Sequence, residues 1–201
     1  MLKLLKKISE ERLLRIFIKM KENIHETIEF PEGFEFKINR NEIIVSHKGK
    51  EIKKAFNLKN IDEKKEGNKL VLEAKMGSKR ELKMIKTISA HVKNMIGGLQ
   101  ENYVYKLEIA YLHFPITIEI QKDKGRMLIK NFLGEKNPRI ANIVPGAEVN
   151  IDRNKITIEA NEKEIASQTA ANIEIATKIK NRDRRKFQDG IFITEKAGRA
   201  I

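Results

Sequence analysis

Cysteine is absent from the 201-residue sequence. Its absence excludes disulfide frameworks, thiolate zinc sites and cysteine nucleophiles, and it is compatible with a reducing cytoplasm. No apolar run is long enough to span a bilayer. The sequence also lacks a P-loop, a glycine-rich dinucleotide turn, a nucleophile elbow and a pair of acidic residues in an apolar context. We therefore expect no enzyme, no cofactor and no small-molecule substrate.

Histidine is scarce and scattered. The four histidines have no i,i+4 pairing and no acidic residue at the spacing of a metal site, so we expect each to be a surface or partly packed residue; they are His25, His47, His91 and His113. A hydrolase that pairs a histidine with a carboxylate in space stays open, because sequence spacing cannot exclude such a pair.

Positive charge is what the sequence has in excess. Lys and Arg number 41 against 28 Asp and Glu, giving a formal net charge of +13 and an isoelectric point near 9.8. Such a balance points to an anionic partner. Hydrophobic residues make up 40% of the chain, which is enough to build folded cores rather than a disordered basic protein.

The densest cluster of cations lies at residues 178–186, opposed only by Asp183. We call these residues the cationic segment. Arginine forks bind phosphate oxygens in pairs, and Phe187 can stack on an unpaired base or pack between a helix end and the last strand, which we favour. A solvated helix end is the alternative, because basic residues also complement helix dipoles. The cations are Lys178, Lys180, Arg182, Arg184, Arg185 and Lys186.

Two further cations flank a proline in a loop. Lys136 and Arg139 lie on either side of Pro138, a placement that suits a fixed phosphate contact. A charged surface turn accounts for the same pattern.

The N-terminal segment, residues 1–23, is predicted to be a basic helical extension. Apolar residues at helical spacing form one broad stripe, and seven cations oppose two glutamates in residues 1–21. The helix packs on its own protein or a neighbour, or it lies on a membrane surface as part of a membrane-surface or partner-binding protein.

The remaining sequence reads as two copies of one α+β module. In the first copy, alternating apolar residues predict strands at 34–38, 43–45, 52–56 and 69–74, with a polar loop before the last. Ser78 and Glu81 form a capping-box pattern that begins a helix, and Gly97-Gly98 is expected to end it.

The second copy repeats this order. Strands are predicted at 103–111, 116–120, 127–129 and 154–160, and a helix begins near Asn161 with Glu164 at the capping-box position. This helix leads into the cationic segment and a strand at 191–193, whereas residues 197–201 give little sign of order. We predict two duplicated domains, 24–100 and 101–180, each an antiparallel sheet covered by one helix, and a basic C-terminal extension, 181–201.

The assembled segments closely resemble the family of large-subunit ribosomal protein six, in its archaeal and eukaryotic form. The resemblance extends over residues 28–196. The matching pieces are AHVKNMIGGL (90–99), YKLEIAYLHFP (105–115), NFLGEKNPR (131–139), QTAANIE (168–174) and NRDRRKFQDGIFITEK (181–196).

The resemblance implies a structural, non-enzymatic protein of the cytoplasmic ribosome. It implies two related α+β domains bound to large-subunit rRNA near the base of the factor-recruiting stalk and the sarcin-ricin loop, among neighbouring ribosomal proteins and without a membrane. It places the RNA contacts on Lys136, Arg139 and residues 178–187. Residues 1–21 extend beyond the family's usual start, so they are either a lineage-specific contact or the product of an upstream start codon.

Overall fold

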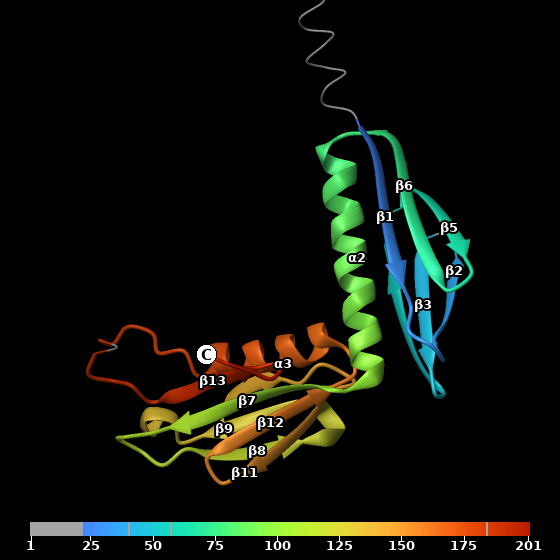
Figure 1. Ribbon diagram of the computed structural model, residues 1–201. Helices are drawn as coiled ribbons and strands as arrows, with labels where there is room; N and C mark the ends of the chain where they lie inside the picture. The colour runs from blue at the N-terminus through green and yellow to red at the C-terminus, as the bar shows by residue number, and fades with distance from the viewer. Residues whose placement is uncertain (1–21, 40, 57, 184) are drawn as a thin grey trace, which may run out of the picture. The chain divides into compact units, whose positions relative to one another are not determined.

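The computed structural model describes residues 22–39, 41–56, 58–183 and 185–201. The chain forms two compact units, the first ending at Ile96 and the second beginning at Gly97 (Figure 1). The predicted helix at residues 1–21 lies outside the described residues. The predicted domain limits at 23/24, 100/101 and 180/181 stay predictions.

The first unit contains two antiparallel three-stranded sheets and most of one long helix, α2 (Lys79–Gln100). Side chains from both sheets reach the helix: Ser89 of α2 donates to Glu26 on one sheet, and Lys54 on the other contacts His91. One sheet has the order β1 (Glu22–Glu29), β6 (Lys69–Gly77) and β5 (Asp62–Glu66). The other has the order β2 (Glu35–Asn39), β3 (Glu42–His47) and β4 (Lys50–Ala55).

The second unit also contains two antiparallel sheets and one helix, α3 (Lys163–Ala176), which packs against β7, β10, β12 and β13 (Figure 1). Its core includes Leu107, Phe132, Ile156 and Ile173, all fully buried. The five-stranded sheet has the order β11 (Glu148–Asp152), β12 (Lys155–Ala160), β7 (Tyr103–Ala110), β13 (Gly190–Lys196) and β14 (Arg199–Ala200). The three-stranded sheet has the order β10 (Arg139–Asn142), β9 (Arg126–Lys130) and β8 (Thr117–Gln121).

The duplicated α+β architecture is confirmed by the strand order. The sheet β1-β6-β5 corresponds to β7-β12-β11, and β2-β3-β4 corresponds to β8-β9-β10. Even a backbone hydrogen bond at the strand ends recurs: Phe30 N donates to Asn68 O at 3.0 Å, and Ile109 N donates to Asn154 O at 2.8 Å. Sequence periodicity did not reveal that each copy divides its strands between two sheets.

The second unit adds to the duplicated pattern a strand, β13, that pairs with the free edge of β7. This strand contains the predicted run at 191–193. Residues 197–201, expected to lack order, instead turn back along β13. Arg199 of β14 pairs there with Lys196 of β13. The cationic segment therefore lies between two anchored elements, α3 and β13.

Three further sequence expectations about individual elements were wrong. The polar loop before β6 contains strand β5, whose residues are all charged. Helix α2 does not stop at Gly97-Gly98 but continues to Gln100. The second helix begins at Lys163 rather than Asn161, and its N-cap residue is Glu162, whose side chain makes no capping hydrogen bond. The capping box at Ser78 is confirmed: Ser78 Oγ accepts from Arg80 N, and Glu81 accepts from Ser78 N at 2.8 Å.

Candidate nucleic-acid interface

The cationic segment (residues 178–186) connects α3 to β13 and exposes its positive side chains. The described members Lys178, Lys180, Arg182, Arg185 and Lys186 are all exposed, and the Arg185 side chain retains 92% of its accessible surface. Arg184 lies outside the described residues. Lys136, in the loop before β10, is also exposed. These side chains are positioned in the same unit and are accessible to a polyanion.

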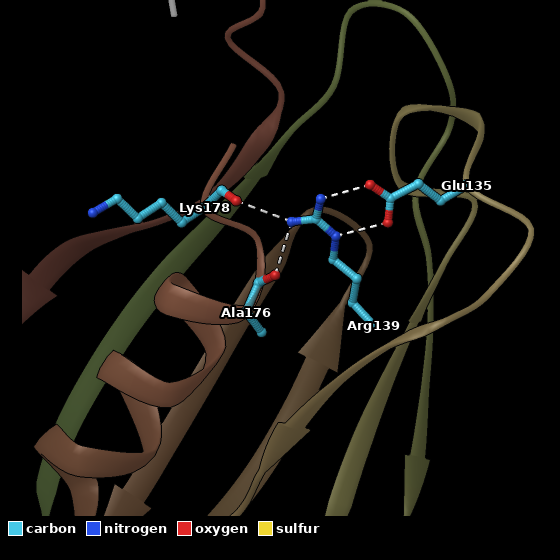
Figure 2. Close-up of polar contacts among 4 residues, drawn as sticks. All are labelled: Glu135, Arg139, Ala176 and Lys178. Atoms are coloured by element: carbon cyan, nitrogen blue, oxygen red, sulfur yellow. Dashed lines mark hydrogen bonds and ion pairs between the residues drawn. The ribbon is translucent and has the colours of Figure 1, made fainter. Parts of the chain in front are cut away.

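Arg139 holds the start of this segment in place (Figure 2). Its Nη1 donates to the carbonyl oxygens of Ala176 and Lys178, both at 3.0 Å. Its Nε and Nη2 donate to the Glu135 carboxylate at 2.8 and 2.6 Å. The guanidinium also lies 4.2 Å from the centre of the buried Phe132 ring. Arg139 thus satisfies a carbonyl at the end of α3, where helices leave carbonyls without partners.

We call the contacts of Arg139 with Glu135, Ala176 and Lys178 the clamp. The Lys178 side chain points away from this clamp (Figure 2). Glu135 forms an ion pair with Arg139. The hydrogen bond from the Arg139 side chain lowers the pKa of Glu135, against the opposing effect of burial. Among the described residues, Lys136, Lys178, Lys180 and Lys186 form no ion pair. The clamp therefore leaves the neighbouring lysines available for an external anion.

Side chains at the end of α3 also bind the open edge of β13. Ile191 N donates to the buried Thr177 hydroxyl at 3.0 Å, and Ile193 N donates to Glu174 Oε1 at 3.3 Å. An open strand edge presents unpaired amides. These two contacts satisfy such amides and fix the distance between the two ends of the cationic segment.

The far end of the segment is anchored through Asp189, whose side chain is fully buried. Its carboxylate accepts from His113 N at 3.1 Å and from His113 Nδ1 at 2.8 Å. Burial by itself raises the pKa of Asp189, but the hydrogen bonds from His113 and from the Leu112 backbone outweigh it, so the pKa is lowered. Asp189 therefore joins the 112–113 loop to the start of β13 as an ionised carboxylate.

Phe187 is half-buried in the second unit's core. Its ring stacks on the His113 ring with centroids 5.0 Å apart, and the Arg182 guanidinium lies 4.9 Å from its centroid. The ring is packed in the fold, as preferred from the sequence, but the contacts shown are with His113 and Arg182 rather than with the helix end and the last strand.

Within the segment, Asp183 organises the turn. Its carbonyl accepts from Lys186 N at 3.1 Å and Phe187 N at 3.0 Å, while its carboxylate accepts from Arg185 N at 3.0 Å. Arg185 Nε lies 3.5 Å from the same carboxylate. The lone acidic residue thus shapes the backbone of the loop that carries the cations.

The sequence by itself does not predict the residues that hold the segment: Glu135, Thr177, Glu174 and the pairing of His113 with Asp189. Each contact joins residues that are far apart in the chain or carry no motif. The one available signal was the resemblance to the ribosomal family, because all of these residues except Thr177 lie in the segments that carry it.

The His113–Asp189 pair does not form a nucleophilic site. The nearby Thr177 hydroxyl donates to Glu174 O and accepts from Ile191 N, so its bonding capacity is used structurally. In the described part of the chain, no three His, Asp or Glu residues are grouped to hold a metal ion. His47 Nδ1 donates to Gly33 O, and His25 lies beside Glu73. Of the helices the structure describes, none combines the length and apolarity that crossing a bilayer demands.

Comparisons with known proteins identify the family. The family model described as "Ribosomal protein L6" matches residues 114–190. The Methanococcus vannielii protein named "Large ribosomal subunit protein uL6" is 40% identical over 178 residues, which is 89% of this chain and 97% of that protein. The protein of the same name from Methanobrevibacter smithii is 43% identical over 86% of this chain and 96% of its own length. The one from Aeropyrum pernix is 40% identical over 88% and 98%. With this identity over nearly the full length of its relatives, the chain belongs to the ribosomal protein L6 family.

Proposed function

We propose that this protein is a structural, non-enzymatic constituent of the large subunit of the cytoplasmic ribosome. Its relatives carry the name of a large-subunit protein, and the family is a ribosomal one. The described surface suits this role: a rigid unit presents cations on a tethered loop, and it needs no reactive pocket. Its partners are large-subunit rRNA and neighbouring ribosomal proteins.

The cationic segment and Lys136 make the phosphate and sugar contacts in this proposal. The observation that carries it is the exposure of Lys178, Lys180, Arg182, Arg185 and Lys186 on a loop whose two ends are fixed. A fixed loop loses little conformational freedom on binding, so more of the electrostatic attraction is retained as affinity. Arg184 belongs to the set by its sequence. The contacts of Arg139 favour a role in holding the loop beside the RNA.

Salt dependence tests the contacts directly. Replacing Lys180, Arg182 and Lys186 by Ala should lower the slope of log affinity for large-subunit rRNA against log salt by about 0.9 for each lost phosphate contact. A matched variant with Lys122, Lys124 and Arg126 replaced by Ala removes the same charge from exposed positions around β9. If both triple variants change the slope equally, the segment is not the contact surface and only net charge matters.

The site on the rRNA is the finer part of the proposal: the base of the factor-recruiting stalk and the sarcin-ricin loop. The family resemblance supports this location. A photo-crosslinking residue placed at Lys186 should react with nucleotides of these two regions in reconstituted subunits, whereas one placed at Lys124 should not. Crosslinks from Lys186 to other rRNA domains would reject the location while leaving RNA binding intact.

A further inference from the structure

A groove lies beside the cationic segment in the second unit. Its volume is about 1110 Å³, and its walls include Tyr111 and Leu112 after β7, Glu174 and Ile175 at the end of α3, Lys178, and Phe192 on β13. This volume is slightly above the roughly 300–1,000 Å³ of pockets that enclose a drug-sized ligand, so the groove is large enough for a small organic group. The groove and the cationic segment share Lys178, so the groove borders the surface that a ligand of the segment contacts.

Four of the large apolar side chains that remain exposed lie on the walls of this groove. Leu112 is 79% exposed, Ile175 63%, Tyr111 45% and Phe192 40%. Contiguous exposed apolar residues around a hollow mark a binding site in a folded protein. Phe187 also lines the groove, but its ring is already in contact with His113 and Arg182. Tyr111 and Phe192 are therefore the rings available for a ligand.

The position of Phe192 is set by a glycine. A Cβ placed on Gly190 would lie 2.8 Å from the Phe192 ring, so the ring rests against the backbone of β13. Across the sheet, Gly190 of β13 pairs with Ala110 of β7. The missing side chain at residue 190 thus gives the ring its place on the wall of the groove.

The exposed cations that adjoin the groove, Lys178 and the other described cations of the cationic segment, favour a ligand that carries an anionic group beside a flat apolar part. The two acidic residues in the walls are engaged: Asp189 accepts from His113, and Glu174 accepts from Ile193 N. Lys178 has no ion pair in the described part of the chain. Lysine is depleted at the centres of protein–protein interfaces, whereas nucleic-acid grooves combine cations with aromatic platforms.

We propose that this groove receives an unpaired nucleotide of the RNA, with its base against Tyr111 and Phe192 and its phosphate beside Lys178. The proposal rests on the proposed function, because the cationic segment must first bring the RNA to this face. It adds recognition of an unpaired base to the sequence-independent attraction between the cations and phosphates. Single-stranded bases stack on aromatic rings without a need for a particular sequence.

The test uses the full-length protein and two RNA hairpins that carry the fluorescent base 2-aminopurine. In one hairpin the base is a single bulged nucleotide, and in the other it is paired within the stem. We expect the wild-type protein to quench the bulged base and to bind its hairpin more tightly than the paired one. Replacing Tyr111 and Phe192 by Leu should weaken binding of the bulged hairpin roughly 5- to 150-fold, in line with stacking of one base, and should abolish the quenching.

Matched variants separate stacking from other effects. Tyr111→Phe keeps the ring and should retain both affinity and quenching. Gly190→Ala should displace the Phe192 ring without changing charge, and it should reduce quenching while the protein stays folded, because the ring end that it meets is free to move. The salt slope should be unchanged in all these variants, since no cation is lost.

Three outcomes overturn the inference. The Leu variant could bind both hairpins as the wild type does, or it could weaken both equally. It could also leave RNA binding intact and lose binding to another ribosomal protein, which would make the groove a protein-docking site. Failure of the proposed function looks different: the wild-type protein would then bind neither hairpin with a salt-dependent affinity.

Discussion

At the scale of single residues, Arg139 illustrates how a cation in a basic protein acts inside the fold. Its guanidinium contacts four acceptor atoms, on Glu135, Ala176 and Lys178. Planar donors in a fixed fork suit this arrangement, which a lysine ammonium cannot reproduce. A count of positive charges therefore overstates the number of side chains that face the RNA.

We predict that Arg139→Ala lowers the free energy of unfolding by about 2 kcal/mol, because hydrogen bonds to charged groups are lost and carbonyls at the end of α3 are left unpaired. Urea denaturation measures this. Arg139→Lys should be almost as destabilised. RNA affinity should fall in both variants while the salt slope stays that of the wild type.

Lys136→Ala is the control for this prediction. It should leave stability unchanged and lower the salt slope by about 0.9, as expected for one lost phosphate contact. An Arg139→Ala variant with full stability and a reduced slope would make Arg139 a direct phosphate contact instead.

Asp189 leads to a prediction about acid stability. Its pKa is lowered in the folded protein, so it contributes stability above its unfolded value, about 3.9. That contribution is lost as the pH falls through the lower folded value. Compared with Asp189→Asn, the wild-type protein should lose its stability advantage as the pH drops below about 4. Thermal melting across this range measures the effect, and the exposed Asp123→Asn should leave the pH profile as it is.

At the scale of elements, charged strands escaped the sequence analysis because they lack an apolar pattern. β5 is DEKKE, and among the described strands it pairs with β6 alone. Charges on an edge strand are compatible with pairing on one side and discourage further pairing on the other. Strand β1 is not predicted from the sequence for a related reason, because a charged residue interrupts its apolar face. Glu26 sits on its inward face between Ile24 and Ile28, where Lys86 Nζ and Ser89 Oγ donate to its carboxylate.

Helix α2 passes through Gly97-Gly98 because both glycines lie in close contacts within the second unit. A Cβ on Gly98 would lie 1.8 Å from the backbone oxygen of Asn161, and one on Gly97 would lie 2.8 Å from the Tyr103 hydroxyl. The glycines that suggested a helix end therefore serve close packing, a role that local sequence cannot distinguish from a stop.

We predict that Gly98→Ala destabilises the protein by about 1–3 kcal/mol, although alanine is the better helix former. The physical reason is that a backbone oxygen cannot move aside as a side chain can. Gly97→Ala should cost less, since it meets the end of a tyrosine side chain. Urea denaturation of both variants checks the order, and a stabilised Gly98→Ala would show that the contact relaxes freely.

The start of α2 supports a further prediction. Ser78 and Glu81 form the capping box, and the hydrogen bonds from Ser78 lower the pKa of Glu81 to about 2. Ser78→Ala should lower the free energy of unfolding by about 1 kcal/mol. Thr87→Ala, on the exposed side of the same helix, serves as a comparison that leaves the cap intact. Equal losses in the two variants would argue against a specific capping contribution.

At the scale of the whole molecule, the two copies of the duplicated module differ in what they carry. The second unit carries the cationic segment and an additional strand, β13, which pairs with one edge of β7. The corresponding edge of β1 in the first unit has no partner among the described strands. Both ends of the cationic segment are fixed within the second unit. In the proposed function, the net charge of +13 attracts RNA over a distance, and the fixed segment determines where contact occurs.

We predict that the intact protein sediments with large ribosomal subunits and that detergent does not release it, whereas raised salt does. Retention should fall steeply with ionic strength because phosphate contacts release counterions. Flotation of the protein with liposomes, and its loss from subunits in detergent, would instead support the membrane-surface alternative.

The sequence by itself determined the α+β class, the duplication, most of the strands with apolar alternation, the first capping box and the concentration of cations at residues 178–186. Each of these depends on local periodicity or composition, which the chain carries in linear order. Only the tertiary structure decided that β1 and β5 are strands, that Gly98 lies against Asn161, and that Arg139, Thr177 and Asp189 hold the cationic segment. The physical reason is that these contacts join groups distant in sequence, so their energies exist only after the chain has folded.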